Sequence, residues 1–148
     1  MKELITKSFD KSKFVIDAMS NHDEGDIDPH IVDFITEINK SEDIMTLYSC
    51  EGHHDGDNAY LLFNVSEKGW DIFWSKVVPA LSWRLCIDKS EYGGPIYQVN
   101  WIVSSKSNQY NSGISIHTVL ASNGLYSWDE SKEVFWKVIS EEFLKNFK

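Results

Sequence analysis

The sequence predicts an α+β domain in which helices cover a mostly antiparallel sheet of about five strands. Its length of 148 residues suits one domain with a core of its own, so we expect a single domain over residues 1–148. A hydrophobic content of 42% and an aromatic content of 14% are typical of globular chains. The hydrophobic periodicities follow the order helices, two strands, helix, three strands, helix, and this order indicates the fold class.

The first half of the chain carries signals for short helices followed by two strands. Leu4–Met19 has a helix-like spacing that polar residues interrupt, which predicts one or two short helices. Asp28 is a good N-cap residue directly before Pro29, so a helix is expected to begin there. That helix would bury a face made of Ile31, Phe34, Ile35 and Ile38. Two β-branched or aromatic runs around a glycine-containing loop then predict strands at Ile44–Cys50 and Ala59–Val65.

The second half of the chain also contains both helix-like and strand-like segments. Apolar residues from Trp70 to Val78 recur at helical spacing, which predicts an amphipathic helix that ends at Pro79. Ser127 and Glu130 form a capping-box pattern before apolar residues at every fourth position, so a long closing helix is expected. Between these helices, three strands are expected at Trp83–Ile87, Ile96–Val103 and Ile114–Ala121.

Charge is distributed unevenly along the chain. It has 14 Lys and Arg residues against 23 Asp and Glu residues, and its formal net charge is −9. Residues 1–60 hold 14 acidic and 5 basic side chains, so this segment carries the whole excess. Arg84 is the one arginine of the sequence, which disfavours a phosphate-binding face. Nucleic acids, tRNA included, are therefore disfavoured as partners.

Two features that the sequence lacks indicate where the protein resides. No apolar run approaches the ~20 residues that a membrane-spanning helix needs, so no membrane association is expected. The first residues show no apolar core and no small-residue cleavage site of a signal peptide, so we expect a cytoplasmic protein. In that compartment Cys50 and Cys86 are expected to be reduced thiols.

The densest polar cluster is Ser49–Asp57, where a buried strand opens into a loop. Cys50 and His53 have C-x-x-H spacing, and a zinc shell could be completed by His54, Asp55 and Asp57. A structural zinc site normally has a second Cys or His pair, which the sequence does not supply. We therefore predict no metal site. Cys50 itself is interpreted either as a thiolate nucleophile with a neighbouring histidine as base or as an inert packed thiol.

A second polar cluster, Asn108–Gly113, lies between two expected strands. Its simplest interpretation is a hairpin turn in which Gly113 supplies an unusual backbone angle. Arg84 stands beside Trp83 and would either grip a ligand carboxylate or phosphate or serve as an internal ion-pair partner. Both segments therefore supply candidate ligand contacts.

Several short patches occur in a defined order along the chain. They are Phe9-Asp10-Lys11, Gly25-Asp26-Ile27-Asp28, Ile38-Asn39, Thr46-Leu47-Tyr48-Ser49-Cys50-Glu51-Gly52 and Asn111-Ser112-Gly113-Ile114-Ser115. This order resembles the tRNA wybutosine-synthesizing protein 3 family, which has a G-s-i-D run, a helix ending in I-N, a T-x-S-S-C-x-G-R run and an N-S-G-I-T turn. Short bacterial and phage proteins with an S-C-x-G-H loop look like closer relatives of this chain.

The resemblance implies an α+β fold in which the S-C-x-G loop and the N-S-G-I turn border one site. Family members methylate a guanosine derivative in tRNA, so the resemblance implies a methyltransferase-like protein that binds S-adenosylmethionine or another small nucleotide-like ligand. Catalytic and purely binding roles both stay open. The implied catalytic residues are Cys50, His53 and Asp55. The implied ligand-binding residues are Thr46, Ser49, Gly52, His54, Arg84, Asn111, Ser112 and Gly113.

The acidic segment supports a different class of function. From Asp23 to Asp57 it holds 11 acidic side chains, with Lys40 as its only lysine and no arginine. Clustered charge accelerates association with an oppositely charged surface. A non-catalytic inhibitor or immunity protein that binds a basic protein partner is therefore the alternative.

Overall fold

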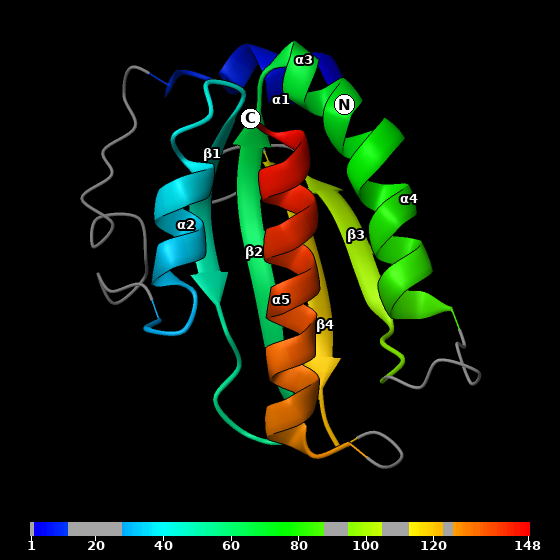
Figure 1. Cartoon of the computed structure of the whole chain (residues 1–148). Coiled ribbons are helices and arrows are strands. Elements are labelled where there is room, and N and C mark those ends of the chain that lie inside the picture. Colours follow the sequence, from blue (N-terminus) through cyan, green and yellow to red (C-terminus); the bar gives the residue numbers. More distant parts are fainter. Residues whose placement is uncertain (1, 12–27, 88–94, 105–112, 123–125) are drawn as a thin grey trace.

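An antiparallel sheet and a layer of helices make up the part of the chain that the structure describes (Figure 1). The computed structural model describes residues 2–11, 28–87, 95–104, 113–122 and 126–148. Three helical segments cover one face of the sheet: α2 (Val32–Ile38), α5 (Trp128–Asn146) and the long segment that starts with α3 (Glu67–Ile72). The predicted α+β class is confirmed.

The described part of the sheet has four strands in the order β1-β2-β4-β3, and each neighbouring pair is antiparallel. Their bounds are Ile44–Cys50 for β1, Asp57–Val65 for β2, Val99–Ser104 for β3 and Gly113–Leu120 for β4. β1 has its predicted bounds, and the other three lie close to theirs. Cys50 pairs with Tyr60 and Tyr60 with His117, so these residues form one row across the sheet.

The predicted strand at Trp83–Ile87 is wrong, and so is the predicted helix end at Pro79. The described sheet therefore has four strands rather than the expected five. Instead, the chain stays helical through α3, the π-helical turn η3 (Phe73–Val77), α4 (Val78–Leu81) and the π-helical turn η4 (Ser82–Cys86).

A wide turn just before Pro79 lets the helix continue. The Val78 amide donates to the carbonyl of Phe73, five residues back. In a regular α-helix the proline ring clashes with a carbonyl of the preceding turn, and a π-helical turn displaces that carbonyl. Buried apolar residues continue at i+4 spacing through this region, at Val77, Leu81 and Leu85. Burial against the sheet therefore outweighs the helix-breaking signal of the proline.

The first and last helices follow the sequence signals more closely. α1 (Lys2–Ser8) is the described part of the predicted helical range Leu4–Met19, and residues 12–19 lie outside the described residues. α5 starts with the predicted capping box, in which Ser127 Oγ accepts the Glu130 amide and the Glu130 side chain accepts the Ser127 amide. No helix in the described ranges is both long enough and apolar enough to cross a membrane.

The core lies between the sheet and the helix layer, with the ring of Phe143 at its centre. The centroid of this ring lies 5.4 Å from that of Phe63, 6.0 Å from that of Phe34 and 6.0 Å from that of Phe73. These four buried rings join α5 to β2, α2 and η3. They hold the last turns of α5 against the sheet, α2 and η3.

Candidate functional site

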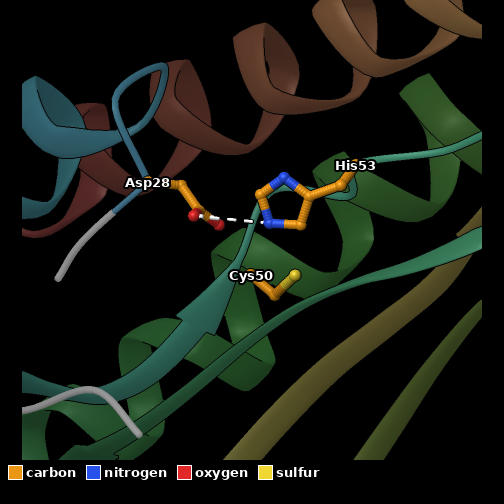
Figure 2. Close-up of side chains that lie close together, drawn as sticks. All are labelled: Asp28, Cys50 and His53. Carbon is orange, nitrogen blue, oxygen red and sulfur yellow. Dashed lines mark ion pairs between the residues drawn. The ribbon is translucent and has the colours of Figure 1, made fainter. Parts of the chain in front are cut away.

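Asp28, Cys50 and His53 form a compact polar cluster where β1 ends (Figure 2). Cys50 is the last residue of β1, His53 follows in the loop, and Asp28 lies in the turn before α2. One ligand atom of each residue lies within 4.8 Å of the other two. Asp28 Oδ1 is 3.4 Å from His53 Nε2. The cluster thus combines sulfur, nitrogen and oxygen donors from two separate segments.

Backbone hydrogen bonds hold these side chains in place. The second oxygen of Asp28, Oδ2, accepts the Glu51 amide at 2.8 Å, which ties the turn before α2 to the end of β1. Because this carboxylate binds the Glu51 amide, it does not cap α2. The predicted helix start directly after Pro29 is therefore wrong, and α2 begins at Val32. The His53 amide donates to Asp57 Oδ2 at 2.9 Å.

Gly52 makes the sharp turn between Cys50 and His53 possible. Its φ of +90° lies in the region that L-residues rarely adopt, and a Cβ there would lie 3.1 Å from Leu120 Cδ1. Its amide donates a hydrogen bond to the Cys50 sulfur. A glycine is therefore required for this loop to bring the histidine back over the cysteine.

The charges around Cys50 oppose ionisation of its thiol. Burial raises the pKa of Cys50, the Gly52 amide lowers it in part, and three carboxylates raise it further: Asp28, Asp57 and Glu51. Without a cation nearby, the thiol therefore stays protonated at neutral pH. This environment is unlike that of a cysteine nucleophile, whose pKa is lowered by cationic neighbours.

Glu51 is a buried carboxylate that the sequence analysis did not single out. Its side chain is 4% exposed, and His30 Nδ1 lies 2.9 Å from Oε2 and within hydrogen-bond geometry of Oε1 at 3.1 Å. Lys132 Nζ lies 3.5 Å from Oε1, and the indole of Trp136 donates to the Glu51 carbonyl at 2.9 Å. A lone glutamate after an apolar strand is the only signal that the sequence offered for it.

A cleft of about 450 Å³ lies between α2 and α5, on the side of Glu51 that faces His30 and Lys132. Apolar side chains of Ile31, Phe34 and Trp136 are part of its lining. Its polar lining consists of His30, Asp129, Lys132, Glu133, Lys137 and Ser140. The cleft therefore combines an apolar part with two lysines and two carboxylates.

The structure brings some predicted site residues together and separates others. Cys50 and His53 meet as expected, but their carboxylate partner is Asp28. Asp55 instead accepts hydrogen bonds from the amide and hydroxyl of Ser122, both at 3.2 Å, just beyond β4. His54 is exposed.

Two other predicted ligand contacts lie on β1. Thr46 is buried, and it exchanges hydrogen bonds with the Asn39 side chain at 2.8 and 2.9 Å, which fixes the end of α2 to the strand. The hydroxyl of Ser49 is buried and has no hydrogen-bond partner among the described residues. Neither residue belongs to the Asp28, Cys50 and His53 cluster.

Gly113 lies toward the other end of the sheet from Cys50. Cys50 lies in the row of Tyr60 and His117, whereas Gly113 is four residues earlier on β4, about 13 Å along the strand. Gly113 therefore does not border the same site as the S-C-x-G loop, although the resemblance implied that the loop and the N-S-G-I turn do. Asn111 and Ser112 lie outside the described residues.

Arg84 is an internal ion-pair partner, which is one of its two predicted roles. It lies on the helical turn η4, with Nη2 3.0 Å from Glu141 Oε2 and Nη1 3.5 Å from Glu142 Oε2. Both partners belong to α5, so the arginine joins two helices.

No protein-family model, no curated protein and no solved structure matches this chain. The resemblance to the wybutosine-synthesizing protein 3 family therefore stays a prediction from the sequence patches.

Proposed function

We propose that this protein is a small cytoplasmic protein that binds a zwitterionic, nucleotide-like ligand in the cleft between α2 and α5. The single observation that supports this function most is the balance of charge over an apolar surface in that cleft. A volume of about 450 Å³ falls within the range of small-molecule sites, about 300–1,000 Å³. Ligand sites typically combine such an apolar lining with a few polar groups.

The charges of the cleft favour one class of ligand over another. Lys137 would attract a carboxylate, since Lys132 is already paired with Glu51, whereas Asp129 and Glu133 would attract an ammonium or sulfonium group. A polyanion such as a nucleoside triphosphate or tRNA would meet repulsion from the two carboxylates. S-adenosylmethionine carries both signs of charge and an aromatic base, and it is the cofactor that the family resemblance implies.

His30 is the group in this cleft best placed to accept a proton. Its side chain is 73% exposed and lines the cleft, while Nδ1 contacts the buried carboxylate of Glu51. A carboxylate that contacts one imidazole nitrogen orients the ring and fixes its tautomer. If the protein is a methyltransferase, His30, oriented by Glu51, would accept the proton in place of the implied catalytic residues His53 and Asp55.

Calorimetric titration of the full chain with S-adenosylmethionine tests this function. We expect saturable binding at submillimolar concentration, and weaker binding of adenosine triphosphate because of its charge. Lys137→Ala should weaken S-adenosylmethionine binding about tenfold. Lys145→Ala, on the same helix but outside the cleft, should leave it unchanged. Absence of binding at millimolar ligand, or equal losses in the two variants, would contradict the proposal.

A specific observation also favours the second function, capture of a basic protein partner. Asp33 and Glu42 are exposed on the acidic segment, and the nearby Lys40 is already paired with Glu37 at 2.7 Å. Such a surface would accelerate association with a cationic partner at low ionic strength. A pull-down at low and physiological salt, with Asp33→Lys and Glu42→Lys as variants, tests this role. A partner retained equally under all these conditions would exclude it.

A further inference from the structure

We propose that Asp28, Cys50 and His53 are the three protein ligands of a zinc-class divalent cation, with a fourth coordination position open to water or a substrate. This site is separate from the cleft between α2 and α5 and does not depend on the ligand proposed for it. It also differs from the sequence-based expectation of no metal site.

The spacing of the donor atoms is close to what tetrahedral zinc requires. Zinc binds sulfur at about 2.3 Å and nitrogen or oxygen at about 2.0–2.2 Å, so adjacent ligand atoms lie about 3.3–3.6 Å apart. Asp28 Oδ1 and His53 Nε2 are already 3.4 Å apart. The Cys50 sulfur lies within 4.8 Å of the other two donors, so it has to move by about 1 Å at most.

The orientation of the three side chains favours a metal over a proton relay. In a Cys-His-Asp relay the thiol and the carboxylate contact different nitrogens of the imidazole. In Figure 2 the Cys50 sulfur lies beside the same edge of the His53 ring as Nε2, the atom that faces Asp28. All three donors thus face one point, as ligands of one ion do.

The surroundings of the cluster suit a cation. The carboxylates of Asp28, Glu51 and Asp57 all act on the Cys50 thiol, and together they create a negative field. Lys132 places a positive charge 3.5 Å from Glu51 Oε1 on the side of the cleft. A divalent cation at the cluster would compensate the remaining charge and bind the sulfur as thiolate.

Backbone amides hold two of the three donors, those of Asp28 and Cys50, and a third amide fixes the loop at His53. The amide of Glu51 donates to the second oxygen of Asp28, that of Gly52 to the Cys50 sulfur, and that of His53 to Asp57. Outer hydrogen bonds of this kind orient metal ligands and tune their basicity.

The donor set and its exposure define the class of ion and site. Sulfur with imidazole selects zinc or a similar borderline metal over magnesium and calcium, which prefer oxygen ligands. The side chain of His53 is 49% exposed, so the cluster is open on one side. Three protein ligands with one open position is the arrangement of catalytic zinc sites.

Titration of the reduced full chain with Co²⁺ and Zn²⁺ tests the site directly. We expect one equivalent of either metal and a sulfur-to-cobalt charge-transfer band in the Co²⁺ form. Cys50→Ser should remove this band and weaken Zn²⁺ binding at least about 100-fold, and His53→Asn should weaken it at least about tenfold. The matched controls Cys86→Ser and His54→Asn should stay within about twofold of the wild type, because neither residue belongs to the cluster.

Three results would overturn the inference. One is a wild-type chain that binds Zn²⁺ no more tightly than Cys50→Ser, and another is a cobalt band that persists in Cys50→Ser. The third is loss of the band in Cys86→Ser, which would place the thiolate elsewhere. Circular dichroism of each variant distinguishes loss of a ligand from loss of the fold, and Asp28→Asn, which keeps the shape of the side chain, provides an independent third test.

Discussion

The surroundings of the two cysteines differ although each cysteine ends a secondary-structure element and is half-buried. Cys50 ends a strand and Cys86 ends a helical segment, and both are half-buried. Burial raises the pKa of both thiols, and one backbone amide partly offsets this rise in each case, Gly52 for Cys50 and Val99 for Cys86. Carboxylates also raise the pKa of Cys50, whereas no charged group of the described residues shifts that of Cys86.

A packed thiol and a thiol in a functional site can be distinguished by the polar groups around the sulfur. Burial is common to both cysteines and therefore does not distinguish them. What distinguishes Cys50 is the convergence of an imidazole and a carboxylate on its sulfur. The region of Cys86 should accordingly respond to mutation through stability alone, while that of Cys50 should respond through binding as well.

Leu85→Ala is expected to have the largest effect on stability. Leu85 is fully buried and precedes Cys86, so its truncation should cost about 2–5 kcal/mol through lost burial and a cavity. Urea unfolding measures this loss, and calorimetry on the folded variant should show unchanged Zn²⁺ binding. A change in metal affinity would contradict the view that the region of Cys86 acts on stability alone.

Lys132→Met should have the next largest effect, in the region of Cys50. The buried Glu51 carboxylate would lose its contact with the Lys132 ammonium and keep its contact with His30. Breaking a buried pair outright costs about 3–5 kcal/mol, so with one partner left we expect about 2 kcal/mol in urea unfolding. Lys137→Met, at an exposed position of the same helix, is the control and should change stability by less than about 0.5 kcal/mol.

Gly52→Ala should cost about 1–3 kcal/mol because it places a side chain at a φ of +90°. Gly56→Ala is the matched control, since its φ is +86° but no atom lies within 4 Å of the added Cβ. The difference between the two variants isolates the contact with Leu120. Only Gly52→Ala should weaken Zn²⁺ binding, measured by calorimetry, because it displaces His53 relative to Cys50. Equal metal affinities would show that the turn does not position the cluster.

Two of the three residues of the Asp28, Cys50 and His53 cluster could be predicted from the sequence. Cys50 and His53 are only three residues apart in the chain, so their C-x-x-H spacing predicts that they lie close together in the fold, as they do. Asp28 lies 22 residues away from Cys50, and its position before Pro29 favoured the interpretation as a helix cap. In the structure the Asp28 side chain accepts a hydrogen bond from the Glu51 amide. This contact depends on how α2 packs against β1, so no local sequence pattern predicts it.

The fold shows the same division between local and tertiary signals. The capping box at Ser127 and the strand at Ile44–Cys50 were predicted correctly, because a cap and a run of strand-favouring residues are local signals. The strand at Trp83–Ile87 was wrong because Pro79 was taken as a helix end. The buried spacing from Val77 through Leu85 indicates a helix there, but only packing against the sheet shows which signal prevails.

Tyr97→Phe should have the smallest effect, and a pH-dependent one, in the region of Cys86. The Tyr97 hydroxyl donates to the Ser131 carbonyl at 2.6 Å, its amide donates to the Leu85 carbonyl at 2.7 Å, and burial raises its pKa. At neutral pH the lost hydrogen bond should cost about 1 kcal/mol. The folded state keeps the phenolic proton above about pH 10, where the unfolded chain releases it, so the wild type loses this stability as pH rises further.

The deficit of Tyr97→Phe relative to the wild type should therefore be constant between about pH 7 and pH 9 and shrink above about pH 10, as measured by urea unfolding. Zn²⁺ affinity at neutral pH should not change, since Tyr97 belongs to the packed region that ends at Cys86. A deficit that grows with pH would mean that the phenol is not held in its protonated form. A changed metal affinity would instead show that packing around Cys86 reaches the cluster at Cys50, and the two cysteines would no longer mark independent regions.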